Sequence, residues 1–124
     1  MNFSTTSLDE IANANRGDLD DLPFGVIGFD DEGIVQTYSA AESRMAGLSP
    51  DRVVGKHFFT AVAPCMNNFM VAQRFDDALE QNSALDETID YVLTLRMRPV
   101  KVALRLLSTP GSATRYVLVK RQPK

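Results

Sequence analysis

Apolar and polar residues alternate over three consecutive segments in the last third of the chain, and this feature most constrains the fold. The segments cover residues 88–97, 100–107 and 115–121, and a Thr-Pro-Gly-Ser turn separates the last two. Successive side chains of a strand point to opposite faces, so each segment predicts a strand with one apolar side. Three such strands predict an antiparallel sheet whose second face meets water, with Lys101 and Arg105 on that wet face.

A further pair of strands is predicted near the other end of the chain. Residues 24–29 are apolar and partly β-branched, and the turn-forming residues 30–33 follow them. Residues 34–38 can then pair back as the second strand of a hairpin. Together, the two regions predict five antiparallel strands.

Four helices are expected between and before these strands. Ser7 and Glu10 have the spacing of a capping box, so a short helix should run to about Asn15 and end at residues 16–18. Residues 39–45 are rich in alanine and should form a helix that Gly47 stops. Residues 49–50, Ser-Pro, should open a one-turn helix that ends at Gly55.

The longest helix is expected between residues 68 and 81. Apolar residues recur there at spacings of three, three, three and one, which is typical of a helix with one buried face. The residues of this stripe are Phe69, Ala72, Phe75, Ala78 and Leu79.

The element order is therefore two strands, a run of short helices, one longer helix and three strands. This order predicts an α+β fold with helices packed over one five-stranded antiparallel sheet, and it resembles the PAS fold. We expect residues 1–124 to form a single domain, with residues 1–22 as an N-terminal helical cap and residues 23–121 as the PAS core.

Composition excludes several classes of function. The net charge of −3 gives no reason to expect nucleic acid or an anionic membrane as a partner. Acidic residues at 30–32 interrupt the best apolar run, and the polar N-terminus is unlike a targeting peptide. A single cysteine is unusual for a secreted disulfide scaffold, and no Cys/His set has metal-site spacing. We therefore expect a cytoplasmic protein without a metal site.

Tyr38 and Glu42 are four residues apart at the entrance to an alanine-rich helix, so their side chains should project to about the same side. In one interpretation, Glu42 is solvated and Tyr38 is an aromatic residue at a strand end. In the other, Glu42 faces inward among alanines, where burial favours its protonated form and makes it a hydrogen-bond donor. The residues alone leave both interpretations open.

The lone Cys65 follows an Ala-Pro pair, and it also has two interpretations. A free cysteine is commonly a small buried apolar residue. A reactive thiolate would need a base or a positive environment, and His57, the single histidine, lies eight residues upstream. A Cys-His pair would make the chain a thiol enzyme or redox sensor, but nothing else in the sequence supports that class.

Three stretches of the sequence together resemble the photoactive yellow protein family. They are Leu-Pro-Phe-Gly-Val-Ile from residue 22, Tyr-Ser-Ala-Ala-Glu from residue 38, and Val-Gly-Lys-His-Phe-Phe-Thr-Ala-Val-Ala-Pro-Cys from residue 54. The ending, with Tyr-Val-Leu-Val-Lys-Arg from residue 116, resembles that family's last strand. The resemblance covers residues 19–121.

The resemblance implies a blue-light photoreceptor, not an enzyme, that carries p-coumaric (4-hydroxycinnamic) acid as a thioester on Cys65. Tyr38 and Glu42 would donate hydrogen bonds to the phenolate of this pigment. Light would isomerise the pigment from trans to cis, Glu42 would give it a proton, and the resulting charge would drive partial unfolding. The expected lining of the pocket comprises Ile27, Ala46, Leu48, Phe58, Val62, Ala63, Pro64 and Met97.

Several residues depart from the family pattern. Leu93 and Leu95 replace aromatic residues of the third strand, and Met66 follows the cysteine where a threonine is common. Two further changes concern the pocket. Family members usually have a threonine where this chain has Ala46 and an arginine where it has Leu48. Arg44 is a nearby cation, but its relation to the pocket does not follow from the sequence. These changes predict a shifted absorption maximum or phenolate pKa and altered recovery kinetics.

Because of these departures, the sequence leaves an alternative function open. The chain could be a PAS module that binds another ligand or a protein and carries no pigment. In either case the expected partner is an unidentified downstream signalling protein, and the expected state is a monomer or weak dimer.

Overall fold

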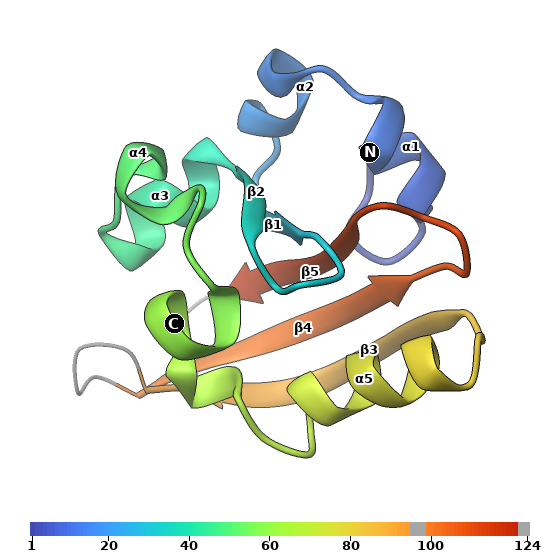
Figure 1. Cartoon of the computed structure of the whole chain (residues 1–124). Coiled ribbons are helices and arrows are strands. Elements are labelled where there is room, and N and C mark those ends of the chain that lie inside the picture. The colour runs from blue at the N-terminus through green and yellow to red at the C-terminus, as the bar shows by residue number, and fades with distance from the viewer. Residues whose placement is uncertain (95–98, 122–124) are drawn as a thin grey trace.

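The computed structural model describes residues 1–94 and 99–121. Its sheet has five strands in the order β2-β1-β5-β4-β3, and every neighbouring pair is antiparallel. The strands are β1 (Gly25–Phe29), β2 (Val35–Tyr38), β3 (Leu85–Leu93), β4 (Val100–Ser108) and β5 (Arg115–Arg121). The predicted five-stranded α+β fold is confirmed, and the pairing of β1 with β5 places the last strand at the centre of the sheet (Figure 1).

The third strand is shifted from its predicted position. β3 begins at Leu85, three residues before the predicted start, and pairs with β4 from Leu85↔Ser108 to Leu93↔Val100. The predicted strand continued to residue 97, and residues 95–97 lie outside the described part of the chain. Ile89 and Tyr91 pack against the core as the alternation predicted, while Val92 on the other side is exposed.

The N-terminal segment contains two short helices where one was expected. α1 (Leu8–Asn13) begins with the predicted capping box of Ser7 and Glu10. The prediction that residues 16–18 only end this helix is wrong, because α2 (Arg16–Asp20) begins there. The side chain of Asn15 accepts a hydrogen bond from the Asp18 N–H at 2.8 Å, so it caps a new helix.

The middle of the chain forms short helical elements. α3 (Ala40–Ala46) begins after Ser39 and ends at Gly47, whose φ of 74° is in the left-handed region that favours glycine. α4 (Pro50–Val53) is the predicted single turn, although Val54 and not Gly55 ends it. Two tight turns follow, η1 (Phe58–Val62) and η2 (Pro64–Met66), and the second contains Cys65.

The helix α5 (Ala72–Glu80) is the longest in the described part of the chain, but it begins four residues later than predicted. The amide oxygen of Asn68 accepts hydrogen bonds from the N–H groups of Met70 and Val71, at 3.0 and 3.2 Å, so these residues form a turn. Phe69 is 79% exposed and Leu79 is 50% exposed. The buried stripe is therefore Ala72, Phe75 and Ala78, and α5 lies across β3 and β4 (Figure 1).

The main core lies between the sheet and the helical elements η1, η2 and α5. Four phenylalanines make its centre, with ring centroids of Phe29 and Phe58 5.3 Å apart and those of Phe29 and Phe75 5.1 Å apart. Phe59 packs edge-on against Phe29. Apolar aromatic burial of this density fixes the position of the turns that precede and contain Cys65.

The other face of the sheet is only partly wet as predicted: Lys101 is exposed, but the N-terminal segment covers the part of this face that β1, β4 and β5 form. Phe3, Leu8 and Ile11 of that segment are buried in a second core cluster with side chains of β1, β4 and β5. Arg105 was expected in solvent, but it is 4% exposed. Its guanidinium donates to the carbonyls of Phe3 and Thr6, at 3.0 and 2.6 Å, and pairs with Asp86.

Two further features bear on function. No helix in the described residues is long and apolar enough to cross a membrane. Within the same residues, no group of three or more His, Cys, Asp or Glu side chains could hold a metal ion.

Candidate functional site

Glu42 lies in the first turn of α3 and is 2% exposed, so the structure has the inward-facing arrangement. The hydroxyl of Ser39 accepts hydrogen bonds from the Val26 N–H at 2.9 Å and the Glu42 N–H at 3.5 Å. These bonds attach the start of α3 to β1. The local sequence Ser-Ala-Ala-Glu therefore turns the Glu42 side chain toward the sheet.

The Glu42 carboxylate is held by Arg121 at the end of β5. Nη1 of Arg121 donates to Oε1 at 2.7 Å, and Nη2 donates to Oε2 at 3.1 Å. The side chains of Arg121 and Glu42 are 12% and 3% exposed, respectively. From the sequence alone we expected Lys120 and Arg121 to form a solvated edge, and for Arg121 this is wrong, because its side chain is largely buried.

Gly25, at the start of β1, makes room for this ion pair. A Cβ atom at this position would overlap Oε1 of Glu42 and would also crowd the Cβ and carboxyl carbon of Glu42. The absence of a side chain at Gly25 therefore lets the carboxylate lie against the strand, within reach of Arg121.

Tyr38 ends β2 and is 5% exposed. Burial raises the pKa of its hydroxyl well above the ordinary value, the negative charge of Glu42 raises it further, and the positive charge of Arg121 partly opposes both. Tyr38 is therefore a neutral phenol and a hydrogen-bond donor near Glu42. Tyr38 belongs to the main core cluster, and its hydroxyl is close enough to Glu42 to feel the charge of the carboxylate.

Cys65 is a free, partly buried thiol in η2, packed against the main core cluster. Its carbonyl oxygen accepts two hydrogen bonds, from the Tyr91 hydroxyl at 2.5 Å and from Nδ2 of Asn68 at 3.2 Å. Nδ2 of Asn68 also donates to the Tyr91 hydroxyl at 2.5 Å. The backbone that carries the thiol is thus fixed to β3.

Asn68 and Tyr91 were not among the predicted site residues. Tyr91 carried a signal, since it lies on the apolar side of a predicted strand and has a polar tip that needs a partner. Asn68 carried none, because it follows a second asparagine in a stretch that we predicted to be helical. Their meeting at the Cys65 carbonyl is a product of the tertiary fold.

His57 forms no dyad with Cys65: within the described residues, no hydrogen bond joins the two side chains. The His57 ring lies against Gly33, which has a φ of 84°, and 6.4 Å from the ring centroid of Phe59. Its Nδ1 is buried without a protein hydrogen-bond partner. The arrangement offers no base for activating the thiol.

Most of the residues predicted to line the pocket belong to the main core cluster or pack against it. Tyr38, Ile27, Phe58, Val62 and Ala63 belong to the main core cluster, and Leu48 packs against it. Ala46 is buried, whereas Pro64 and Arg44 are exposed. Met97 was also predicted to line the pocket, and it lies outside the described residues.

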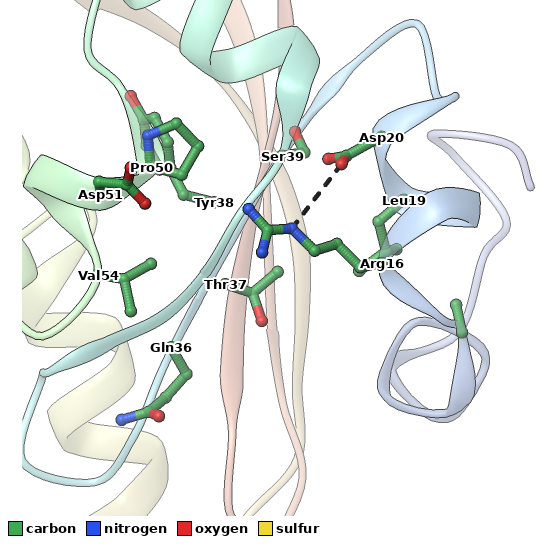
Figure 2. Close-up of a pocket in the computed structure, with 11 residues that line it drawn as sticks. Arg16, Leu19, Asp20, Gln36, Thr37, Tyr38, Ser39, Pro50, Asp51 and Val54 are labelled. Carbon is green, nitrogen blue, oxygen red and sulfur yellow. Dashed lines mark ion pairs between the residues drawn. The ribbon is translucent and has the colours of Figure 1, made fainter.

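A hollow of about 340 Å³ lies beside this group, between α2, β2 and α4. Figure 2 shows its lining residues, among which Nε of Arg16 lies 3.9 Å from Oδ2 of Asp20 in an ion pair. Tyr38 and Ser39 border the hollow, but Cys65 and Glu42 do not line it. Asp20 also accepts a hydrogen bond from the Ala40 N–H, so α2 is attached to the start of α3.

Comparison with known proteins places these residues in a family. Residues 15–121 match the family model described as the PAS fold. The chain is 36% identical to a photoactive yellow protein of Rhodothalassium salexigens, over 91% of this chain and 93% of that protein. It is 34% identical to one of Halochromatium salexigens, over 98% of this chain and 97% of that protein.

A solved structure agrees with these relatives. The photoactive yellow protein domain of the sensor histidine kinase Ppr from Rhodospirillum centenum has a TM-score of 0.82 and 34% identity to this chain, and the match covers 90% of this chain and 97% of that domain. The resemblance inferred from residues 22–65 is thereby confirmed at the level of the whole chain. The chain belongs to the photoactive yellow protein family, a group of PAS-fold photoreceptors that act in signal transduction.

Proposed function

We propose that this chain senses blue light through p-coumaric acid bound as a thioester to Cys65. One observation carries the proposal: a free thiol on a fixed backbone packs against the same apolar core that buries a neutral tyrosine, with a buried carboxyl group beside it. These are the groups needed to anchor a flat aromatic acid and to hold its phenolic end.

The residues of the chain have distinct proposed roles around this group. Sγ of Cys65 forms the bond, and Tyr91 and Asn68 hold the Cys65 backbone in place through its carbonyl. The Tyr38 hydroxyl donates a hydrogen bond, as does Glu42 when its carboxyl is protonated. Apolar side chains such as Ile27, Phe58 and Val62 exclude water, so these hydrogen bonds act in a medium of low dielectric. The bound group supplies absorption of blue light and a double bond that isomerises.

Glu42 is the residue that we propose to link light to signalling. Loss of its proton leaves a carboxylate in a position that is 2% exposed. Until it reaches a new partner, such a buried charge costs several kcal/mol, which is a large part of the roughly 5–15 kcal/mol that stabilises a domain. The segment least tied to the main core, residues 1–22, is the expected part to release toward a downstream signalling protein. We expect the chain to be a monomer or weak dimer.

Reconstitution tests the proposal. The purified protein is mixed with an activated ester of p-coumaric acid, and the intact mass and visible spectrum are recorded. The expected result is one acyl adduct and a red-shifted band that blue light bleaches reversibly. Cys65→Ala should lose both adduct and band, whereas Glu42→Gln should keep the adduct and shift the band. An adduct that survives Cys65→Ala would refute the assignment.

A second candidate function is a PAS module that binds a ligand or protein without a pigment. The observation that favours it is the engagement of Glu42 by Arg121, together with Ala46 and Leu48 in place of the family's usual threonine and arginine. The same experiment separates the two. Absence of any adduct, in a folded protein with an accessible Cys65 thiol, would support the second function.

A further inference from the structure

The ion pair of Glu42 and Arg121 lies at the junction of the candidate site with the last strand. Glu42 belongs to the first turn of α3, and Arg121 is the last residue of β5, 79 positions later. Two parallel N–H···O bonds of 2.7 and 3.1 Å join them, and both side chains are largely buried. Paired bonds of this kind between guanidinium and carboxylate combine strength with a fixed orientation.

Within residues 1–94 and 99–121, the cations that neighbour this pair in sequence are not placed to replace Arg121. Lys120, the preceding residue of β5, points to the opposite face, where its ammonium lies 5.9 Å from the ring centroid of Phe3. Arg44 is on the same helix as Glu42 but is exposed. Among the described residues, the titratable side chains that act on this position are Tyr38, which lies within electrostatic range of both partners, and Arg121 itself.

One carboxyl group cannot satisfy two opposed demands at once. To accept both hydrogen bonds from Arg121, Glu42 must be ionised. To donate to a phenolate beside Tyr38, it must hold a proton, and a neutral carboxyl loses most of its attraction to the guanidinium. The two arrangements are therefore alternatives, and the proton on Glu42 decides between them.

We propose that Arg121 is a positioning residue that receives the Glu42 carboxylate once Glu42 has lost its proton, in competition with the pigment. This inference rests on the proposed function. In the proton-transfer step the O–H bond of Glu42 breaks and an O–H bond forms on the phenolate oxygen, with no other reactant. The carboxylate then has a partner, so Arg121 stabilises the signalling state and ties α3 to the end of β5 in that state.

The first arm of the test uses the protein without pigment. Urea unfolding compares the parent with Arg121→Gln, Glu42→Gln and the double variant, and Lys120→Gln is the matched control from the adjacent position. We expect the two single losses of stability to be strongly non-additive, with the double variant close to either single variant, and Lys120→Gln to couple to neither. Additive losses would show that Glu42 and Arg121 do not interact, and this result would overturn the proposal.

The second arm uses the loaded protein and follows recovery after a flash. Arg121→Gln should leave the dark-state band near that of the parent, because Glu42 is then bound to the pigment. It should speed recovery about tenfold, since the signalling state loses its stabilising cation. Arg121→Lys, which retains a charge but not the paired bonds, should be intermediate and serves if Arg121→Gln folds poorly. Lys120→Gln should recover at the parent rate.

The two arms separate failure of this proposal from failure of the proposed function. Unchanged recovery in a protein that loads pigment would overturn the role of Arg121 and leave the photoreceptor proposal intact. Failure to load, with a coupled pair in the first arm, would refute the proposed function and also the competition, because nothing would then compete for Glu42.

Discussion

The two faces of the sheet are covered in different ways. On one face, aromatic side chains from β1, η1 and α5 interdigitate around Phe29. On the other, the N-terminal segment lies over β1, β4 and β5 (Figure 1). There the buried guanidinium of Arg105 donates hydrogen bonds to the carbonyls of Phe3 and Thr6. The first face joins elements throughout the chain, whereas the second depends on residues 1–22. The second covering can therefore open while the first remains closed.

Removal of an aromatic ring from the main core should have the largest effect. Phe29→Ala should reduce the free energy of unfolding by about 3–5 kcal/mol, because it leaves a cavity among three other phenylalanines. Urea unfolding measures the change. Phe69→Ala is the matched control, since Phe69 is 79% exposed and should change stability by at most about 0.5 kcal/mol. Similar losses in the two variants would contradict the assignment of the core.

Removal of the Arg105 guanidinium should loosen the N-terminal segment that covers the other face of the sheet. Arg105→Gln leaves the carbonyls of Phe3 and Thr6 without their donor, at a local cost of about 1.5–3 kcal/mol for bonds to a charged group. Hydrogen exchange should quicken more than tenfold in α1 and α2 and stay near the parent rate in β4 and β5. Lys101→Gln, an exposed change on the same strand, should leave the exchange rates of both regions unchanged. Uniform acceleration throughout the chain would show that the two faces open together.

Alkaline pH should distinguish the buried tyrosines of the two faces. Burial raises the pKa of both Tyr38 and Tyr116, with the larger rise at Tyr38, where Glu42 adds its charge. An unfolded tyrosine loses its proton near pH 10, but the folded ones keep theirs, so stability is complete below about pH 10 and falls as the pH rises.

The expected slope is at most about 1.4 kcal/mol per pH unit for each such group, and it levels off as the pH reaches the pKa of that group in the folded protein, which happens earlier for Tyr116. Thermal unfolding between pH 9 and about 11 should show that Tyr38→Phe removes part of this alkaline loss and that Tyr116→Phe removes a smaller part. Equal effects of the two substitutions would contradict the contribution of Glu42.

The smallest effect is expected at the backbone of Cys65, the proposed attachment point of the pigment. Tyr91→Phe removes one of the two donors to the Cys65 carbonyl and leaves Asn68, so the expected loss of stability is about 1 kcal/mol. The Cys65 thiol should react faster with a disulfide reagent, because η2 is less firmly held. Val92→Ala, an exposed change beside Tyr91, is the control. An unchanged thiol reaction rate would show that Asn68 alone fixes this turn.

The local parts of the fold could be predicted from the sequence. Alternation located the last three strands, and an apolar run followed by turn residues located the first two. The capping box located α1, and Gly47 marked the end of α3. The errors arose where a polar side chain bonded the backbone beside it. Asn15 started α2 where a helix end was expected, and Asn68 delayed the start of α5.

The candidate site could be predicted only in part, for a similar reason. The approach of Tyr38 to Glu42 followed from local spacing. The partners of the buried arginines did not, because Arg121 meets Glu42 across 79 residues and Arg105 meets the carbonyl of Phe3 across 102. Both arginines lie on strands whose alternation points to a face, but alternation does not reveal what covers that face.

Gly25 has a consequence for how the site can vary. A methyl group there would deny the carboxyl of Glu42 the place it occupies against β1. The side chain would have to leave the place in which Arg121 holds it, so a purely steric change would break the same ion pair that protonation weakens. The ion pair of Glu42 and Arg121 therefore depends on the size of residue 25 as well as on the charge of the carboxyl group.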